Sequence, residues 1–143
     1  MPQLLAALGV LFTACGVGDV ISQGVASIIP DGNRFIAVAV YCVGMALFTI
    51  IMGNGFAAFS VITVGIGIPF LIMQGGANPV VVSAMGLTAG YCGTLLTPMA
   101  ANFNIMPAAL LETKSKYAVI KAQAPMAVVM LIIHIFLMYF LAF

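Results

Sequence analysis

Few side chains in this sequence could bind or transform a ligand, and most of them lie in two short polar stretches within apolar sequence. The first stretch is Gly53-Asn54-Gly55, and the second runs from Thr97-Pro98 to Asn104. An interrupted helix persists at membrane depth only when it is buried in protein or lines a wet cavity. Secondary transporters use such breaks to bind anionic groups and cations. Both stretches are therefore candidates for a transport site.

The first stretch offers an amide side chain beside the expected start of a helix. Glycines on both sides of Asn54 permit almost any backbone geometry. A helix beginning at Phe56 would direct its free amides back toward Asn54, which suits a carboxylate. An ordinary Asn-Gly turn between two full-length helices at the membrane surface explains these residues equally well.

The second stretch combines a proline with two asparagines. Pro98 removes a helix hydrogen bond and frees a carbonyl, and no charged residue stands beside Asn102 or Asn104. This pattern favours a functional unwound segment over a surface loop. The substrate-binding residues predicted from both stretches and the helix after the first are Asn54, Gly55, Ser60, Thr97, Pro98, Asn102 and Asn104.

Two isolated titratable residues could move protons or bind a coupling cation. A charge within an apolar segment, such as Asp19, is a functional-site hypothesis by default. The nearby Ser22 and Gln23 also suit the membrane interface. Asp19 is therefore expected either to couple transport to H+ or Na+ or to lie at the interface. For His134, a hydrogen bond to a neighbouring helix is favoured over a proton relay.

The sequence lacks the residues that other chemistry would need. No His, Cys and carboxylate cluster has metal-ligand spacing and no nucleophile stands near a base, so neither an enzyme nor a metal or organic cofactor is expected. Cys15, Cys42 and Cys92 lie in apolar runs and are predicted to be buried free thiols. The net charge of +1 argues against nucleic-acid binding.

Apolar helices must position these residues. Of 143 residues, 64% are hydrophobic and 5% charged, whereas soluble domains are about 25% charged. A membrane-spanning helix needs roughly 20 predominantly apolar residues. The sequence predicts an all-α membrane protein, a single transmembrane domain over 1–143. Its five hydrophobic segments are 4–29, 35–52, 56–73, 80–96 and 126–143.

Small residues recur along one face of the segment 80–96. At helical spacing, this face predicts close packing against a neighbouring helix. The residues are Ser83, Gly86, Gly90, Thr94 and Thr97. The lysines between Glu112 and Gln123 predict that this connection faces the cytoplasm, on the opposite side from 30–34.

Two stretches carry a resemblance to a known family. The sequences MALFTIIMGNGFAAF (45–59) and GYCGTLLTPMAANFN (90–104) resemble the larger subunit of bacterial two-component 5-oxoproline (pyroglutamate) permeases. This family is grouped with the ion-transporter superfamily, in which two inverted halves each contribute a re-entrant hairpin and a broken helix. The resemblance implies a hairpin over 35–73 with Asn54 at its tip, and a helix over 80–112 broken at 97–104.

The resemblance also implies a function and partners. Family members are longer, so this chain resembles their C-terminal half, one repeat of an inverted-repeat transporter. It is expected to be a subunit that moves a small carboxylate such as 5-oxoproline across the bacterial inner membrane. Expected partners are the lipid bilayer and the smaller permease subunit or a second repeat half, in an oligomeric assembly. The competing hypothesis is a non-transporting scaffold whose glycine faces pack against a transporting or catalytic partner.

Overall fold

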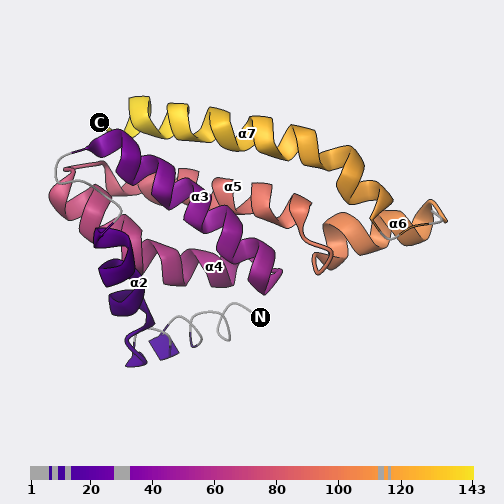
Figure 1. Ribbon diagram of the computed structural model, residues 1–143, viewed down its shortest axis with the longest axis horizontal. Helices are drawn as coiled ribbons and strands as arrows, with labels where there is room; N and C mark the ends of the chain where they lie inside the picture. The colour runs from indigo at the N-terminus through magenta and orange to yellow at the C-terminus, as the bar shows by residue number, and fades with distance from the viewer. Residues whose placement is uncertain (1–6, 8–9, 12–13, 28–32, 113–114, 116) are drawn as a thin grey trace.

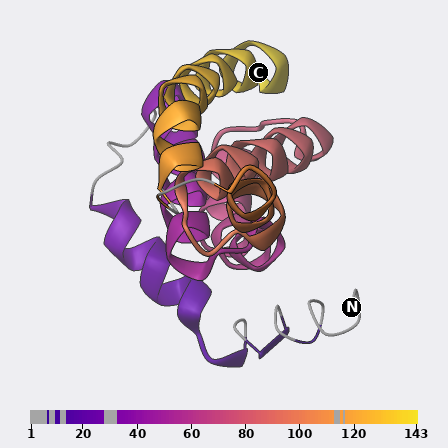
Figure 2. The same ribbon diagram turned by 90° about the vertical axis from the view of Figure 1, so that its right-hand side faces the viewer.

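The chain folds into an assembly of helices (Figures 1 and 2). The computed structural model describes residues 7, 10–11, 14–27, 33–112, 115 and 117–143. No strand occurs in these residues. In chain order the helices are α2 (Val17–Ala26), α3 (Arg34–Met52), α4 (Gly55–Ile62), the π-helix η1 (Thr63–Gln74), α5 (Pro79–Leu96), the π-helix η2 (Ala101–Ile105), α6 (Met106–Leu110) and α7 (Ala118–Ala142).

Four of these helices are long and apolar enough to cross a membrane. They are α3, the continuous run of α4 and η1 (Gly55–Gln74), α5, and α7. Large apolar side chains such as Ile51, Phe140 and Leu141 remain exposed on their outer faces, which suits a hydrocarbon environment. The predicted class, an all-α membrane protein, is confirmed.

The first and last predicted segments differ from the observed helices. Helix α2 has 10 residues and begins after Gly16, whose φ of +69° is left-handed. It is too short to span a membrane by itself, and residues 4–6, 8–9, 12–13 and 28–29 of the segment predicted over 4–29 lie outside the described residues. Helix α7 begins at Ala118, eight residues before the predicted start, and continues through Pro125. Membrane helices tolerate such a proline when nearby groups satisfy the freed backbone carbonyl.

The predicted small-residue face of α5 packs against α3. A Cβ atom at Gly86 would overlap the hydroxyl of Tyr41, and one at Gly93 would overlap the carbonyl oxygen of Ala46. Gly90, Thr94 and Thr97 are buried on the same face, and Ser83 is half-buried. The close approach of these two helices therefore depends on glycines.

Buried hydroxyl groups join three helices at the centre. The hydroxyls of Tyr41 in α3 and Thr63 in η1 share a hydrogen bond of 3.0 Å. The Tyr41 hydroxyl also lies 3.5 Å from the carbonyl oxygen of Val82 in α5. Through Tyr41, helix α3 is thus bonded to both η1 and α5.

Helix α7 lies along α5 and α3 (Figure 1). Its C-terminal end contacts the N-terminal ends of both helices. The guanidinium of Arg34 lies 5.0 Å from the ring centroid of Phe143. The amide of Asn78 donates to the carbonyl of Ala142 at 3.0 Å. The Arg34 end of the bundle is thus far from α6 and the start of α7 (Figure 1). Residues 30–32, 113–114 and 116 of the two connections lie outside the described residues, and the predicted sides of the membrane stay a prediction.

Candidate functional site

The first polar stretch forms the tip of the hairpin made by α3 and α4. Helix α3 ends at Gly53, whose φ of +69° disfavours other residues, and the Gly53 amide donates to the Thr49 carbonyl at 2.8 Å. A Cβ at Gly53 would also lie 2.7 Å from that of Met99. Asn54 caps α4 because its Oδ1 accepts from the Phe56 amide at 2.9 Å. The tip is therefore a defined turn that leads directly into a helix start.

The second polar stretch breaks the run of helix between α5 and α6. Helix α5 ends at Leu96, and Thr97 is extended, with ψ of 134°. The side-chain amide of Asn104 donates to the carbonyl oxygens of Thr94, at 2.9 Å, and Thr97, at 2.6 Å. Carbonyls at a helix end have no partner within the helix. Asn104 therefore supplies the hydrogen bonds that let α5 stop inside apolar surroundings.

The two interruptions meet. The Thr97 hydroxyl donates to the Ile50 carbonyl in the last turn of α3, at 2.9 Å. Beside this contact lies a cavity of about 170 Å³. It is lined by Gly53, Asn54, Gly55, Phe56, Tyr91, Thr94, Ala100, Asn102 and Phe103. Residues about 45 positions apart in the sequence thus form one small cavity.

Aromatic rings form a wall of this cavity. The rings of Phe56 and Tyr91 meet edge to face, with centroids 6.3 Å apart at 88°. The ring of Phe103 also packs against Tyr91, with centroids 6.2 Å apart at 51°. The described lining residues carry no charge. The cavity therefore offers an apolar wall, two asparagine side chains and the positive end of the α4 dipole.

Three predicted site residues line the cavity, and the others lie elsewhere. Asn54, Gly55 and Asn102 are in the lining. The hydroxyl of Thr97 is engaged with Ile50 next to it. Ser60 is half-buried, and its hydroxyl donates to the Ala57 carbonyl within α4 at 2.9 Å. Ser60 is not among the described residues that line the cavity.

Pro98 and Asn104 line a different pocket, beyond the break. Asp19 is exposed in the first turn of α2, which packs against η1 and α4, and does not line the cavity. Its coupling role stays a prediction.

Two predictions about single side chains are wrong. His134 was expected to bond a neighbouring helix, but its Nδ1 lies 2.8 Å from the carbonyl of Met130, one turn earlier in α7. Cys42 and Cys92 are buried, whereas Cys15 is exposed. Cys15 directly precedes Gly16, where the chain turns before α2, so it is not held within a packed helix.

The aromatic wall was missed by reasoning from polar residues. Phe56 and Phe103 directly follow Gly55 and Asn102, and Tyr91 lies one helical turn before Thr94. That adjacency was a usable signal, because a ring next to a candidate polar residue can reach the same cavity. Only the packing of α4 and η2 on α5 shows that Phe56 and Phe103 both meet Tyr91.

The fold and the cavity define a helical membrane protein whose two helix interruptions meet around an uncharged cavity. A family model described as a protein of unknown function, DUF979, matches residues 1–143. The chain therefore belongs to the DUF979 family. Comparison with curated proteins and with solved structures gave no match.

Proposed function

We propose that this chain is a subunit of a secondary transporter for a small carboxylate such as 5-oxoproline. The observation that carries the proposal is the meeting of Gly53–Gly55 and Ala100–Phe103 around one cavity. Broken helices that face each other are the usual framework of a binding site in secondary transporters. Neither break would persist in lipid without burial. The resemblance of 45–59 and 90–104 to the 5-oxoproline permeases points to the same residues.

The start of α4 would hold the carboxylate. Free amides and the helix dipole favour an anion there, and Gly55 has no side chain to obstruct its approach. Asn54 uses the Phe56 amide through its side chain and the Ala58 amide through its carbonyl oxygen, which leaves the Gly55 and Ala57 amides of the first turn for a ligand. Asn54 thus fixes the first turn of α4. Its substitution would weaken anion binding by moving the backbone amides of that turn.

Asn102 and the aromatic wall would select the rest of the substrate. The exposed amide of Asn102 can both donate and accept, which suits a ligand that carries an amide as well as a carboxylate. Phe56, Tyr91 and Phe103 offer ring faces and edges to an apolar skeleton. The volume of about 170 Å³ restricts the ligand to a small molecule.

The completed transporter would contain a second half or the smaller permease subunit, in an oligomeric assembly of the bacterial inner membrane. H+ or Na+ would drive uptake, with Asp19 as a coupling candidate. The glycine face of α5 speaks against the scaffold hypothesis, because Gly86 and Gly93 pack against α3 of the same chain. That face is not available to a partner.

Uptake of radiolabelled 5-oxoproline in cells tests the proposal. Cells that express the chain with its partner subunit should accumulate the substrate, and Asn102→Ala should abolish most of this uptake at unchanged membrane abundance. Ser60→Ala is the matched control, since its hydroxyl bonds only within α4. Equal uptake by Asn102→Ala and the unmodified chain would refute the site, and no uptake of any small carboxylate would refute the function.

A further inference from the structure

A cation lies against an aromatic ring at the end of the bundle where α3 begins and α7 ends (Figure 1). Arg34 is the first residue of α3, and its guanidinium lies over the ring of Phe143, 5.0 Å from the ring centroid. A ring contact of this kind uses a face of the guanidinium, whereas the N–H donors lie in its plane and point outward. Arg34 is exposed, so the ring positions the charge while the donors stay open to a ligand.

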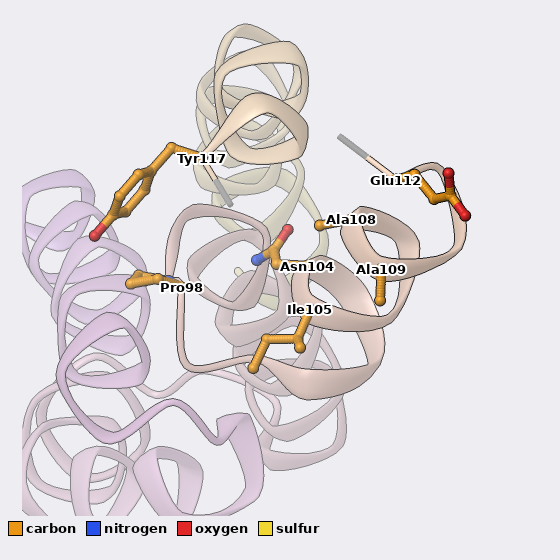
Figure 3. Close-up of a pocket in the computed structure, with 7 residues that line it drawn as sticks. All are labelled: Pro98, Asn104, Ile105, Ala108, Ala109, Glu112 and Tyr117. Atoms are coloured by element: carbon orange, nitrogen blue, oxygen red, sulfur yellow. The ribbon is translucent and has the colours of Figure 1, made fainter. Parts of the chain in front are cut away.

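The described part of the chain offers Arg34 no counter-charge. Its acidic residues are Asp19, in the first turn of α2, and Glu112, after α6, and neither forms an ion pair with Arg34. Glu112 lies beside α6 at the opposite end of the bundle (Figures 1 and 3). Asp31 lies outside the described residues. An anion from outside the described chain can therefore approach this guanidinium.

Two helix starts add to the positive potential at this end. Helix α3 begins at Arg34 and α5 at Pro79. The amide of Asn78 donates to the Ala142 carbonyl, directly before Phe143, so both starts lie at the end of α7. The N-terminus of a helix carries a partial positive charge, which makes a cation in the first turn unfavourable by itself. An anion bound beside Arg34 would offset that repulsion.

A continuous aromatic surface leads from Arg34 into the membrane span. The ring of Phe35 lies 5.6 Å from that of Tyr139 and 5.9 Å from that of Phe136. Tyr139 also packs against Phe140 and Phe143. Arg34 stands at one end of a span, at the depth of lipid headgroups, and the rings extend from there toward the hydrocarbon. The rings that are at least 40% exposed are those of Phe35, Phe136, Phe140 and Phe143.

We propose that Arg34 and these rings bind an anionic phospholipid. The phosphate accepts from the N–H donors of Arg34, which suit a phosphate group well, and the acyl chains lie along Phe35, Phe136 and Phe140. A soluble anion would leave the rings without a partner, and a zwitterionic lipid brings a cation of its own beside the phosphate. The proposal does not depend on transport, because lipid binding can be measured in vesicles without any uptake.

A tryptophan reporter and brominated lipids test this site. The sequence contains no tryptophan, so Phe140→Trp places a single fluorophore on the exposed aromatic surface. The purified full chain is reconstituted into phosphatidylcholine vesicles that contain a fixed fraction of either dibrominated phosphatidylglycerol or dibrominated phosphatidylcholine. Bromine quenches a tryptophan that it contacts, so quenching reports the lipid at the site. Phosphatidylglycerol should be preferred about fivefold over phosphatidylcholine.

Charge variants made in the reporter chain provide the matched controls. Arg34→Gln should reduce the preference to about one. Lys121→Gln removes the same charge at an exposed position near the start of α7 and should leave the preference intact. Arg34→Gln combined with Asp31→Asn keeps the net charge of the chain and should still lose the preference.

Four results would each overturn the site. They are equal quenching by the two lipids in the reporter chain, a preference that survives Arg34→Gln, an equal loss in Lys121→Gln, and loss of the preference in millimolar glycerol 3-phosphate. The last result would show that the site takes a soluble phosphate ester and not a lipid. The comparison of the two lipids needs only the reporter chain, so it decides the question even if Arg34→Gln is unstable.

Discussion

The hydroxyl of Thr97 donates a 2.9 Å hydrogen bond to the carbonyl oxygen of Ile50. Ile50 lies in the last turn of α3, where carbonyls have no partner within the helix. Thr97 stands at the first non-helical position after α5. One side chain thus caps the end of α3 and fixes the break after α5 against the hairpin tip. The cavity between the interruptions depends on this contact.

Removing the Thr97 hydroxyl should weaken the contact between the end of α3 and the break after α5. Thr97→Val keeps the volume of a side chain that is fully buried but leaves the Ile50 carbonyl unpaired, which should lower the free energy of unfolding by about 1–3 kcal/mol. Thr97→Ser retains the donor and should lose less. Denaturant unfolding in detergent micelles measures both, and a Thr97→Val chain as stable as the unmodified one would show that this bond contributes nothing.

Asn102 and Asn104 should behave differently although both are asparagines of the same stretch. Asn104→Leu removes the donor to Thr94 and Thr97 and should cost about 2 kcal/mol or more of stability. Asn102 is exposed and lines the cavity, so Asn102→Leu should change stability by about 0.5 kcal/mol or less while it reduces substrate uptake. Thermal unfolding and uptake, measured on both variants, separate a structural role from a binding role. If Asn102→Leu lowered stability and Asn104→Leu lowered only uptake, Asn102 would have the structural role and Asn104 the binding role.

The small-residue face of α5 should be intolerant of a single methyl group. Gly86→Ala would overlap the Tyr41 hydroxyl and should destabilise the chain by about 1–3 kcal/mol through overpacking. Gly24 in α2 has no other atom within 4 Å of a built Cβ, so Gly24→Ala should be neutral or stabilise by up to about 1 kcal/mol. If the two alanines have the same effect on unfolding, α3 and α5 do not pack as closely as described.

The sequence predicts the middle of this fold better than its ends. The segments 35–52, 56–73 and 80–96 correspond to α3, α4–η1 and α5 within a few residues, because Gly53-Asn54-Gly55 and Asn78-Pro79 carry strong local stop and start signals. The turn at Gly16 was not predicted, since several glycines in the first segment look equivalent in sequence.

The candidate site is predictable in position but not in residue roles. Polar residue types placed both breaks correctly in the chain. Which carbonyl oxygen Thr97 reaches depends on how α3 packs on α5. Which ones Asn104 reaches depends on how the chain folds back on the end of α5, and no local pattern contains either piece of information. The packing of α4 and η2 on α5 brings Phe56 and Phe103 to Tyr91, whereas Ser60 bonds within its own helix.

Substrate protection of a cysteine in the cavity tests the central claim most directly. Phe103 lines the cavity and is exposed, and Phe103→Cys adds an accessible thiol while Asn54 and Asn102 stay intact. Cys15→Ser removes the exposed native thiol, and Cys42 and Cys92 are buried. Gln74→Cys, exposed at the opposite end of the α4–η1 run, is the control.

If the two interruptions form a wet, occupied site, a small water-soluble thiol reagent should modify Phe103→Cys. Saturating 5-oxoproline should slow that reaction about tenfold or more, and modification of Gln74→Cys should not change. A cysteine at position 103 that stays inert, or one that reacts at the same rate with and without each small carboxylate tested, would contradict the account.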